Sequence, residues 1–236
     1  MKISLMFHEV GLQQWSGFFN EKSYKYVISE NEFINLLKYS INISRSRKNI
    51  SYEYTFDDGG ISNLQSAETL TKLGLLGIFF IPTKFIGVKG FLSKENIWQI
   101  RQLGHIIGTH THNHPMFLNK FRYELQSIEW LKSIEILEDI LGEKILLASA
   151  PNGFFNNHTF EILSKTDVRG LYSSLPSSNV KIKRNGVKLF GRSAIKFNNN
   201  NFQTVSNSFF KQKKELFRYQ ILKFVKGLMP FYWNKL

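Results

Sequence analysis

Two short stretches of this 236-residue chain carry the residue types that metal-assisted chemistry needs. Residues 55–59 read TFDDG, which places two adjacent carboxylates, Asp57 and Asp58, at the end of an apolar run. Residues 110–115 read HTHNHP, with His110 and His114 four residues apart. Cations of the zinc type bind imidazole nitrogen and carboxylate oxygen, and a catalytic site keeps three protein ligands and one open position. The sequence therefore predicts a metal site with a spare carboxylate.

The spare carboxylate gives the predicted site its chemistry. One Asp completes a triad with His110 and His114, while the other can take a proton from water, because neighbouring residues leave a strand end in different directions. A helical turn after Thr109 would let both histidines face one way, since positions i and i+4 share a face. His112 would then point away from them. TFDDG alone also suits a strand that enters a turn, but the joint occurrence of both stretches favours a hydrolytic metal site.

These stretches resemble two motifs of the polysaccharide deacetylase family, the NodB-type carbohydrate esterases, which read T-F-D-D-G and H-[ST]-x-x-H-P. The resemblance implies that Asp57 is the catalytic base and that Asp58, His110 and His114 bind a divalent metal, expected to be zinc. Residues 150–153 (APNG) resemble the family's third motif, F-A-Y-P-Y-G in one branch. There the backbone amide of Asn152 would help to bind the oxyanion. Motif order and spacing extend the resemblance from about residue 3 to 195.

The chain departs from the family pattern at two points. Much of the family has an Arg in the third motif, where this chain has Ser149, and a late L-x-H motif that supplies the general acid; this chain has no histidine after His158. We hypothesise that Arg192 replaces the missing Arg and orients Asp57 through a charge-assisted pair. His8, at the end of the first apolar run, is either the missing acid or a structural histidine that hydrogen-bonds a neighbouring loop.

Apolar runs and helical periodicities alternate along the chain, which predicts a distorted (β/α) barrel with its chemistry at the strand ends. The strands are expected at Ile3–Phe7, Tyr52–Phe56, Ile78–Ile81, His105–Thr109 and Lys144–Ala148. The helices are expected around Glu30–Ser40, at Leu64–Leu73, at Ser93–Gly104 and at Phe121–Gly142. The apolar side of the last helix is expected to comprise Leu125, Ile128, Leu131, Ile134, Ile136 and Leu137.

The C-terminal part of the chain differs from the rest. Residues 180–190 alternate apolar and basic side chains about Asn185-Gly186, which predicts a hairpin that covers one side of the barrel. We expect a barrel domain over 1–197 and a basic, aromatic helical tail over 198–236 that belongs to the same unit. Residues 180–236 contain 13 Lys and Arg against one acidic residue, so the basicity of the chain is a property of this end.

The tail from 208 to 228 is amphipathic at helical spacing. It suits a last helix docked on the barrel, or an interfacial helix whose lysines face anionic lipid. Helical spacing explains its Phe and Lys residues better than nucleic-acid binding, which needs stacking platforms beside a basic groove. Residues 208–236 are therefore a candidate for peripheral membrane contact.

Composition limits the remaining possibilities. The absence of cysteine excludes disulfides and thiolate metal sites. Without an apolar signal core or an 18-residue apolar stretch, a cytoplasmic protein is expected, peripheral at the inner face of the plasma membrane if the tail binds lipid. The resemblance implies an enzyme that removes an N-acyl group, most often acetyl in the family, from an amino sugar of a bacterial surface polysaccharide or its lipid-linked precursor. The alternative is a catalytically impaired saccharide-binding protein that keeps the metal.

Overall fold

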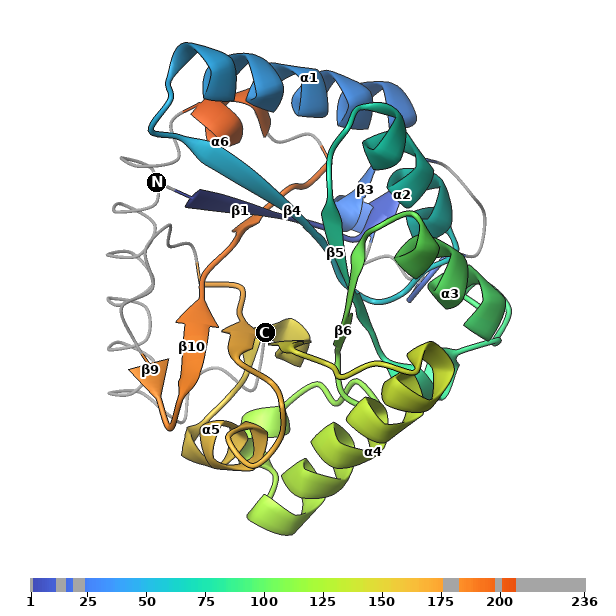
Figure 1. Ribbon diagram of the computed structural model, residues 1–236, viewed down its shortest axis with the longest axis vertical. Helices are drawn as coiled ribbons and strands as arrows, with labels where there is room; N and C mark the ends of the chain where they lie inside the picture. Colours follow the sequence, from blue (N-terminus) through green and yellow to red (C-terminus); the bar gives the residue numbers. More distant parts are fainter. Residues whose placement is uncertain (1, 12–15, 19–23, 176–182, 198–200, 207–236) are drawn as a thin grey trace, which may run out of the picture.

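The computed structural model describes residues 2–11, 16–18, 24–175, 183–197 and 201–206. Within them, nine strands form one curled sheet in the order β11-β1-β4-β5-β6-β7-β8-β10-β9, and only β9 runs antiparallel to its neighbour. The strands are β1 (Lys2–Phe7), β4 (Ser51–Phe56), β5 (Gly77–Ile81), β6 (Ile106–Thr109), β7 (Leu147–Ser149), β8 (Gly170–Tyr172), β9 (Lys183–Arg184), β10 (Val187–Phe190) and β11 (Ser193–Ala194). The fold is the predicted distorted (β/α) barrel (Figure 1).

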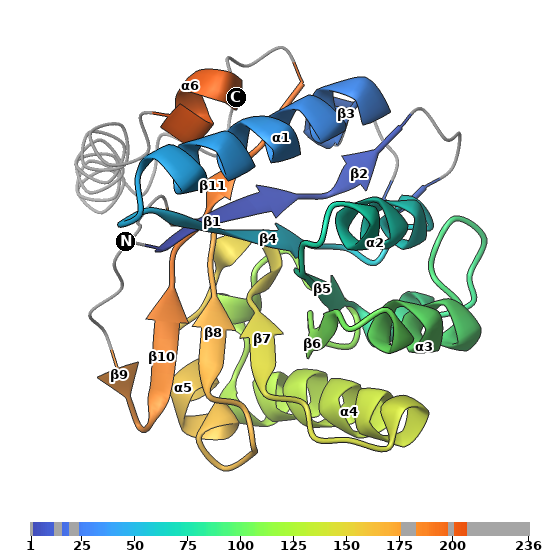
Figure 2. The ribbon, with the colours of Figure 1, turned by 45° about the horizontal axis from the view of Figure 1, so that its top comes forward.

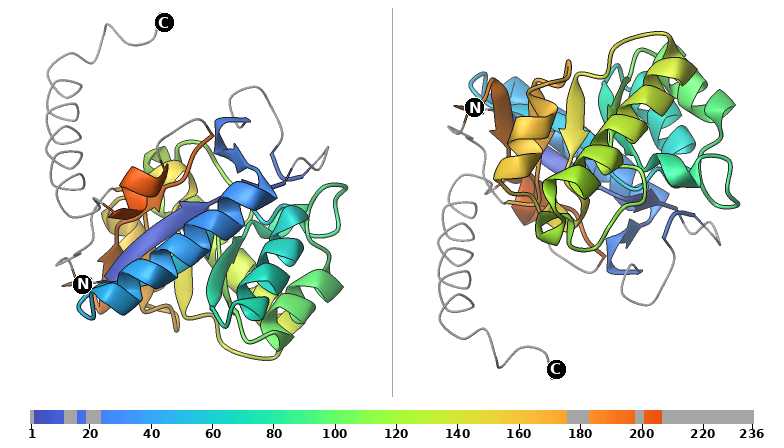
Figure 3. Two further views of the ribbon diagram at one scale, coloured as in Figure 1. Left: turned by 90° about the horizontal axis from the view of Figure 1, so that it is seen from above. Right: turned by 90° about the horizontal axis from the view of Figure 1, so that it is seen from below.

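Helices cover the outer side of the sheet, and α3 and α4 lie side by side there (Figure 3). They are α1 (Glu30–Ser46), α2 (Ser62–Lys72), α3 (Lys94–Gln102), α4 (Tyr123–Leu141), α5 (Asn157–Leu163) and α6 (Asn201–Ser206). A small parallel pair, β2 (Glu9–Val10) with β3 (Val27–Ile28), lies beside the sheet. None of the helices in the described part of the chain has the length and apolarity that crossing a bilayer requires.

The curl of the sheet brings its two ends together. In Figure 2, β7, β8 and β10 turn steeply away from β1 and β4. Strands β10 and β11 lie near opposite ends of the strand order, yet only Gly191 and Arg192 separate them in the chain. The sheet must therefore close almost fully at this seam. Arg192 therefore lies at this seam between β10 and β11, at the carboxyl edge of the barrel, where the other parallel strands also end.

Two apolar clusters hold the two faces of the sheet. The larger one lies between strands and helices and contains the stacked rings of Phe7, Phe56 and Phe79, with neighbouring centroids 5.3 and 4.6 Å apart. The smaller one lies on the other face and contains Ile78, Phe80 and Tyr172. Each fully buried apolar side chain contributes about 1.5–3 kcal/mol to folding. Phe80 fits because Gly108, on the neighbouring β6, has no side chain: a Cβ there would lie 2.6 Å from the Phe80 ring.

The predicted strands and helices all occur, with one shift along the chain. Residues 144–145 lie in the connection between α4 and β7 instead of opening β7, because Lys144 Nζ and the Ile145 amide both hydrogen-bond the Glu138 carboxylate of α4, at 2.9 and 3.1 Å. The strand β7 therefore starts at Leu147 rather than at residue 144.

The predicted apolar face of α4 is confirmed at Ile134 and Leu137 and wrong in the first half of the helix. Leu125, Ile128 and Leu131 are 42%, 56% and 46% exposed. The buried residues of α4 are instead Gln126, Glu129, Trp130, Ser133, Ile134 and Leu137. Periodicity placed the apolar side chains inward, but half of this buried face is polar because it hydrogen-bonds loops at the carboxyl edge of the sheet.

The hairpin about Asn185-Gly186 is present, and β10 is itself a strand of the sheet, paired in parallel with β8, rather than a cover over it. Both turn residues have positive φ, 49° and 84°, as a tight hairpin turn requires. Beyond it, α6 docks on α1, where Asn201 Nδ2 donates to Glu32 Oε1 at 2.7 Å. The predicted domain boundary at 198 and the amphipathic segment 208–228 lie outside the described residues.

A buried carboxyl group, Glu9 of β2, supports the loop that follows β4. Its Oε2 accepts hydrogen bonds from the hydroxyls of Ser16 and Ser62, while Oε1 is buried and has no hydrogen-bond partner among the described residues. A Cβ on Gly60 would lie 2.0 Å from Oε1, so only glycine fits there. Burial raises the pKa of Glu9 to about 7.

The raised pKa predicts a stability that falls as pH rises. The folded state retains the Glu9 proton up to about pH 7, whereas the unfolded chain releases it near 4.5, so this stabilisation is full below 4.5 and is lost as pH rises through 7. In urea unfolding, Glu9→Gln should remove about 3 kcal/mol of pH dependence between about pH 4.5 and 8. The exposed Glu68→Gln is the matched control; equal pH profiles for Glu9→Gln and the unsubstituted chain would contradict the assignment.

Candidate metal centre and catalytic residues

The residues predicted to do chemistry lie at the carboxyl ends of the parallel strands. His8 follows β1, Asp57 and Asp58 follow β4, His110 follows β6, and Arg192 follows β10. The Asp57 amide donates to Phe7 O and the His110 amide donates to Ile81 O, both at 3.0 Å, so pairing with the next strand continues into the site residues. The barrel thus brings together residues that are far apart in the sequence.

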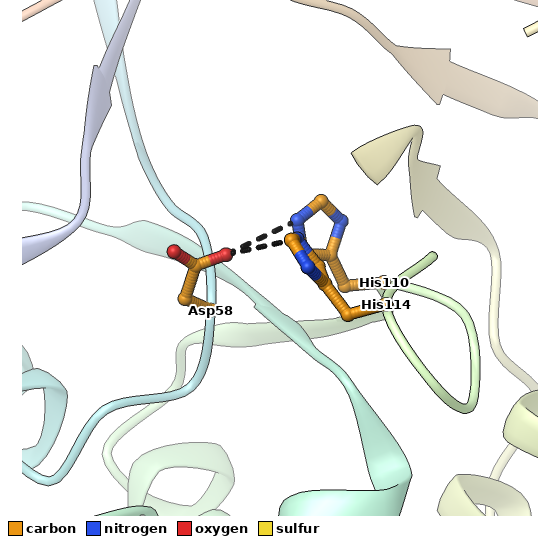
Figure 4. A group of neighbouring side chains, drawn as sticks. All are labelled: Asp58, His110 and His114. Carbon is orange, nitrogen blue, oxygen red and sulfur yellow. Dashed lines mark ion pairs between the residues drawn. The ribbon is translucent and has the colours of Figure 1, made fainter. Parts of the chain in front are cut away.

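Asp58, His110 and His114 converge on one point (Figure 4), with ligand atoms that all lie within 4.8 Å of one another. The Oδ1 atom of Asp58 is 3.2 Å from His114 Nε2 and 3.5 Å from His110 Nε2. Tetrahedral coordination with bonds of about 2.0–2.2 Å places two ligand atoms roughly 3.4 Å apart. The donor set and its spacing therefore fit a divalent cation of the zinc type.

Hydrogen bonding prepares His110 for this role. Its Nδ1 lies 2.8 Å from the carbonyl oxygen of Ser149, which can only accept, so Nδ1 donates this hydrogen bond and Nε2 is the nitrogen that faces Asp58. Burial alone would raise the pKa of Asp58, but hydrogen bonds from His110 and His114 hold that pKa well below its ordinary value. The carboxylate is thus ionised and available as a ligand.

Residues 110–114 do not form the helical turn expected from the i, i+4 spacing. Thr111 and His114 have positive φ, 66° and 54°, which a right-handed helix excludes. The amide of His114 donates to Thr111 Oγ1 at 3.2 Å and closes the loop. A β-branched residue with positive φ is a clear outlier, and such backbone strain concentrates at functional sites. The two histidines meet because the loop reverses.

Glu129 of α4 holds this loop in place, a role that the sequence reasoning missed. Its carboxylate accepts from the amides of His112 and Asn113, at 3.1 and 2.8 Å, and from Asn113 Nδ2 at 2.6 Å. His112 points away from the ligand cluster, as predicted, and its Nδ1 contacts Thr83 Oγ1 at 2.9 Å. The signal that could have revealed Glu129 is an acidic residue on the helix face that turns inward.

Phe18 also contributes to the site without having been predicted. Its ring lies 4.7 Å from the ring of His114, at a 31° tilt, and 4.7 Å from that of Phe85. This packing restricts the orientation of the His114 imidazole. No motif in the sequence marked Phe18, because its contact with His114 depends on the folded loop.

Arg192 and Asp57 form a buried bidentate pair, with N–O distances of 2.6 and 2.7 Å. The other guanidinium N–H groups donate to Thr55 Oγ1, Ser149 Oγ and the carbonyl of Ser173, so all five donors are satisfied. The expected pair is therefore present in the geometry. Ser149, at the end of β7, accepts a hydrogen bond at its hydroxyl from the guanidinium that comes from the seam.

The pair controls the ionisation of Asp57. Burial alone would raise the pKa of Asp57, but Arg192 and then His110 outweigh it and hold the pKa below its usual value. Oδ2 of Asp57 lies 3.8 Å from His110 Nε2, so the carboxylate borders the ligand cluster. An ionised, oriented carboxylate beside a metal site is suited to accept a proton.

His8 lies at the edge of this cluster. Its ring packs on Tyr26 at 4.4 Å, and its Nδ1 is buried with no hydrogen-bond partner among the described residues. Burial lowers the pKa of His8, although Asp58 and Asp57 act to raise it. Both alternatives for His8, the general acid and the structural histidine, therefore stay predictions.

Asn152 lies in the turn η4 (Pro151–Gly153) directly after β7, with φ 54°. Since β7 ends at Ser149, whose carbonyl accepts from His110, this turn starts beside the ligand cluster. Asn152 is exposed, and the oxyanion role of its amide stays a prediction.

The two remaining histidines are structural or exposed. His105 Nδ1 accepts from the amide of Gly77 at 3.0 Å, and its Nε2 donates to Ala67 O at 2.9 Å, which fastens α2 to β5 as expected for a packing residue. His158 is exposed, at the start of α5, where Asn156 caps the helix.

A sequence model of the polysaccharide deacetylase family matches residues 45–171, more than half of the chain. The chain belongs to the polysaccharide deacetylase family. YxkH of Bacillus subtilis, named for the same family, is 32% identical over 113 residues, which are 48% of this chain and 40% of YxkH. The match thus spans well under two thirds of that relative.

Solved structures show the same deacetylase fold. IcaB from Ammonifex degensii superposes with a TM-score of 0.72 at 20% identity, covering 88% of this chain and 96% of IcaB. A polysaccharide deacetylase from Bacillus cereus gives 0.72 at 19% identity over 88% of this chain and 68% of its own. A deacetylase from Streptococcus pyogenes gives 0.61 at 18% identity over 83% and 92%.

The metal assignment can be tested without any substrate. Asp58→Asn and His114→Ala should each lower the affinity of this deacetylase domain for zinc by about 100-fold or more, since each removes one of three ligands. Competition against a chelating dye measures that affinity. His112→Ala, from the same loop, is the matched control and should bind zinc as the unsubstituted chain does. Equal losses in all three variants would refute the ligand set.

Proposed function

We propose that this protein is a metal-dependent hydrolase that removes an N-acyl group from an amino sugar, and that this group is acetyl. The observation that carries the proposal is the joint placement of two elements: the Asp58, His110 and His114 cluster, and beside it Asp57 clamped by Arg192. Structural metal sites use all four positions for protein ligands, whereas three ligands with an adjacent base suit catalysis. Family membership supports deacetylation as the reaction.

A divalent cation bound there would lower the pKa of a coordinated water and polarise the substrate carbonyl. Asp57 accepts the proton of the attacking water, because Arg192 keeps the carboxylate ionised and aims its oxygens toward His110. His110 and Asp57 are buried, whereas the side chains of Asp58 and His114 are 17% and 16% exposed. Water and substrate would therefore approach from the side of Asp58 and His114.

Two further groups complete the proposed reaction. The backbone amide of Asn152 donates to the oxygen that becomes negatively charged, as preorganised amides do in acyl transfer. His8 gives a proton to the leaving amine nitrogen. Burial lowers the pKa of His8, which makes its imidazolium a stronger acid once it forms. In this assignment Arg192 and His8 take the roles for which the sequence lacks the residues usual in the family.

We extend the proposal to the substrate and the location. The substrate would be a bacterial surface polysaccharide or its lipid-linked precursor, handled in the cytoplasm, with residues 208–236 at the inner face of the plasma membrane. Family membership supports the saccharide. The basic, aromatic composition of the tail supports the membrane contact, which vesicle flotation with and without residues 208–236 would test.

Acetate release from N-acetylglucosamine oligomers and N-acetylated bacterial polysaccharides, with zinc added, tests the reaction. Asp57→Asn should lower kcat about 1000-fold while zinc affinity is unchanged, because it removes the base and no ligand. Arg192→Lys should lower kcat by roughly 10- to 100-fold, because lysine keeps the charge but loses the bidentate fork. Stoichiometric zinc and saccharide binding with no release from any substrate would instead support the saccharide-binding alternative.

The acid role of His8 predicts a dependence on the leaving group. An amine leaves only with a proton, whereas 4-nitrophenolate leaves without one. His8→Ala should therefore lower kcat for the N-acetyl saccharide about 100-fold and change 4-nitrophenyl acetate hydrolysis much less. The exposed His158→Ala is the control for both substrates. Equal losses on both would assign His8 a positioning role.

A further inference from the structure

Two exposed aromatic rings touch each other on the rim of the site. Phe117 is 42% and Phe154 is 38% exposed, and their ring centroids lie 5.4 Å apart at 51°. Met116, which precedes Phe117, is 66% exposed. Single exposed apolar residues are common, but a pair from two separate loops makes a continuous apolar surface. Neither ring takes part in the chemistry proposed above.

The position of the pair connects it with the site. Phe117 follows His114 by three residues, and Phe154 follows Asn152 by two. Because a chain extends at most about 3.6 Å per residue, the Cα of Phe117 lies within about 11 Å of that of His114. By the same limit, the Cα of Phe154 lies within about 7 Å of that of Asn152. Both rings thus belong to the loops that follow β6 and β7 at the carboxyl edge of the barrel, the edge that also carries the cation site.

The backbone under both rings is held firmly. Leu118 is fully buried beside Phe117, and the Phe154 amide donates to Pro151 O at 3.0 Å. Asn156 Nδ2 donates to the carbonyl of Asn119 at 2.9 Å, which ties the two loops together. A ligand that stacked on these rings would find them already in place and would lose little affinity to ordering them.

We infer that Phe117 and Phe154 form a stacking platform for a pyranose ring of the saccharide, one that neighbours the sugar whose acyl group reacts. This inference rests on the proposed function and names its substrate class as an oligosaccharide. A pyranose ring presents C–H groups on its faces and hydroxyls at its edge, so it stacks on an aromatic ring while its hydroxyls stay in water. Lys120 Nζ lies over the Phe117 ring, 4.6 Å from its centroid, so a sugar would stack on Phe154 and on the part of Phe117 that Lys120 leaves open. The polar groups of Lys120 and of the exposed Asn113 can hydrogen-bond sugar hydroxyls, which suits a sugar ring better than a lipid chain.

The test measures binding apart from turnover. In the Asp57→Asn background, calorimetry would compare N-acetylglucosamine with its pentasaccharides in β-1,4 and β-1,6 linkage. Phe117→Ala and Phe154→Ala should each weaken pentasaccharide binding about 5-fold and leave monosaccharide binding unchanged. Phe154→Trp should retain the affinity, because it keeps an aromatic face. Phe202→Ala, which removes a 41% exposed ring from α6, is the matched control.

The outcomes separate this inference from the proposed reaction. Length-dependent losses support the platform even when the unsubstituted chain releases no acetate, in which case the hydrolysis proposal alone fails. Equal losses for monosaccharide and pentasaccharide, no loss in either variant, or no binding of any pentasaccharide would overturn the platform. If Phe117→Ala and Phe154→Ala weaken binding to phosphatidylcholine vesicles and leave pentasaccharide binding unchanged, the platform is overturned and the two rings form a lipid contact instead.

Discussion

The ion pair of Asp57 and Arg192 is the interaction on which this site depends. Transferring two charges out of water costs several kcal/mol per ion, and their attraction offsets this only with good geometry and full hydrogen bonding. Both conditions hold, because the pair is bidentate and every guanidinium donor has an acceptor. Arg192 also lies 5.4 Å from the centre of the Phe80 ring, so the pair rests on an apolar floor that excludes water. The same contacts that make the pair tolerable also fix where the Asp57 carboxylate points.

The pair joins the seam of the barrel to its centre. Arg192 lies between β10 and β11, the two strands that meet as the sheet closes, and Asp57 lies at the end of β4, the third strand of the order. Ser149 is small enough to leave room for a guanidinium that comes from the seam, and its hydroxyl bonds to it at 2.8 Å. A side chain from the seam can thus reach the Asp57 carboxylate, because all strands of a parallel barrel end at the same edge.

The sequence predicted the residues that follow directly after strands, but it did not predict the loop conformation and helix face that contacts between separate elements determine. Apolar runs predicted the strands, and the residues directly after them included Asp58 and His110, because a parallel barrel gathers its carboxyl ends. The helical turn predicted for 110–114 was wrong, since His114 is placed by a reversed loop that Glu129 and the left-handed Thr111 shape, and neither leaves a periodic signal. The first half of the predicted α4 face was wrong for the same reason.

Five residues other than glycine have positive φ in the described part of the chain, and four of them, Asp58, Thr111, His114 and Asn152, lie at the site. Each such conformation costs about 1–3 kcal/mol and persists only where its surroundings enforce it. Hydrogen bonds from the loops to α4 and packing of Phe18 on His114 supply that enforcement. The buried polar residues of α4 therefore take positions that apolar side chains could fill, but their hydrogen bonds hold the strained loops in one conformation. Rigid loops, in turn, are what allow three ligand atoms to stay close enough to share one cation.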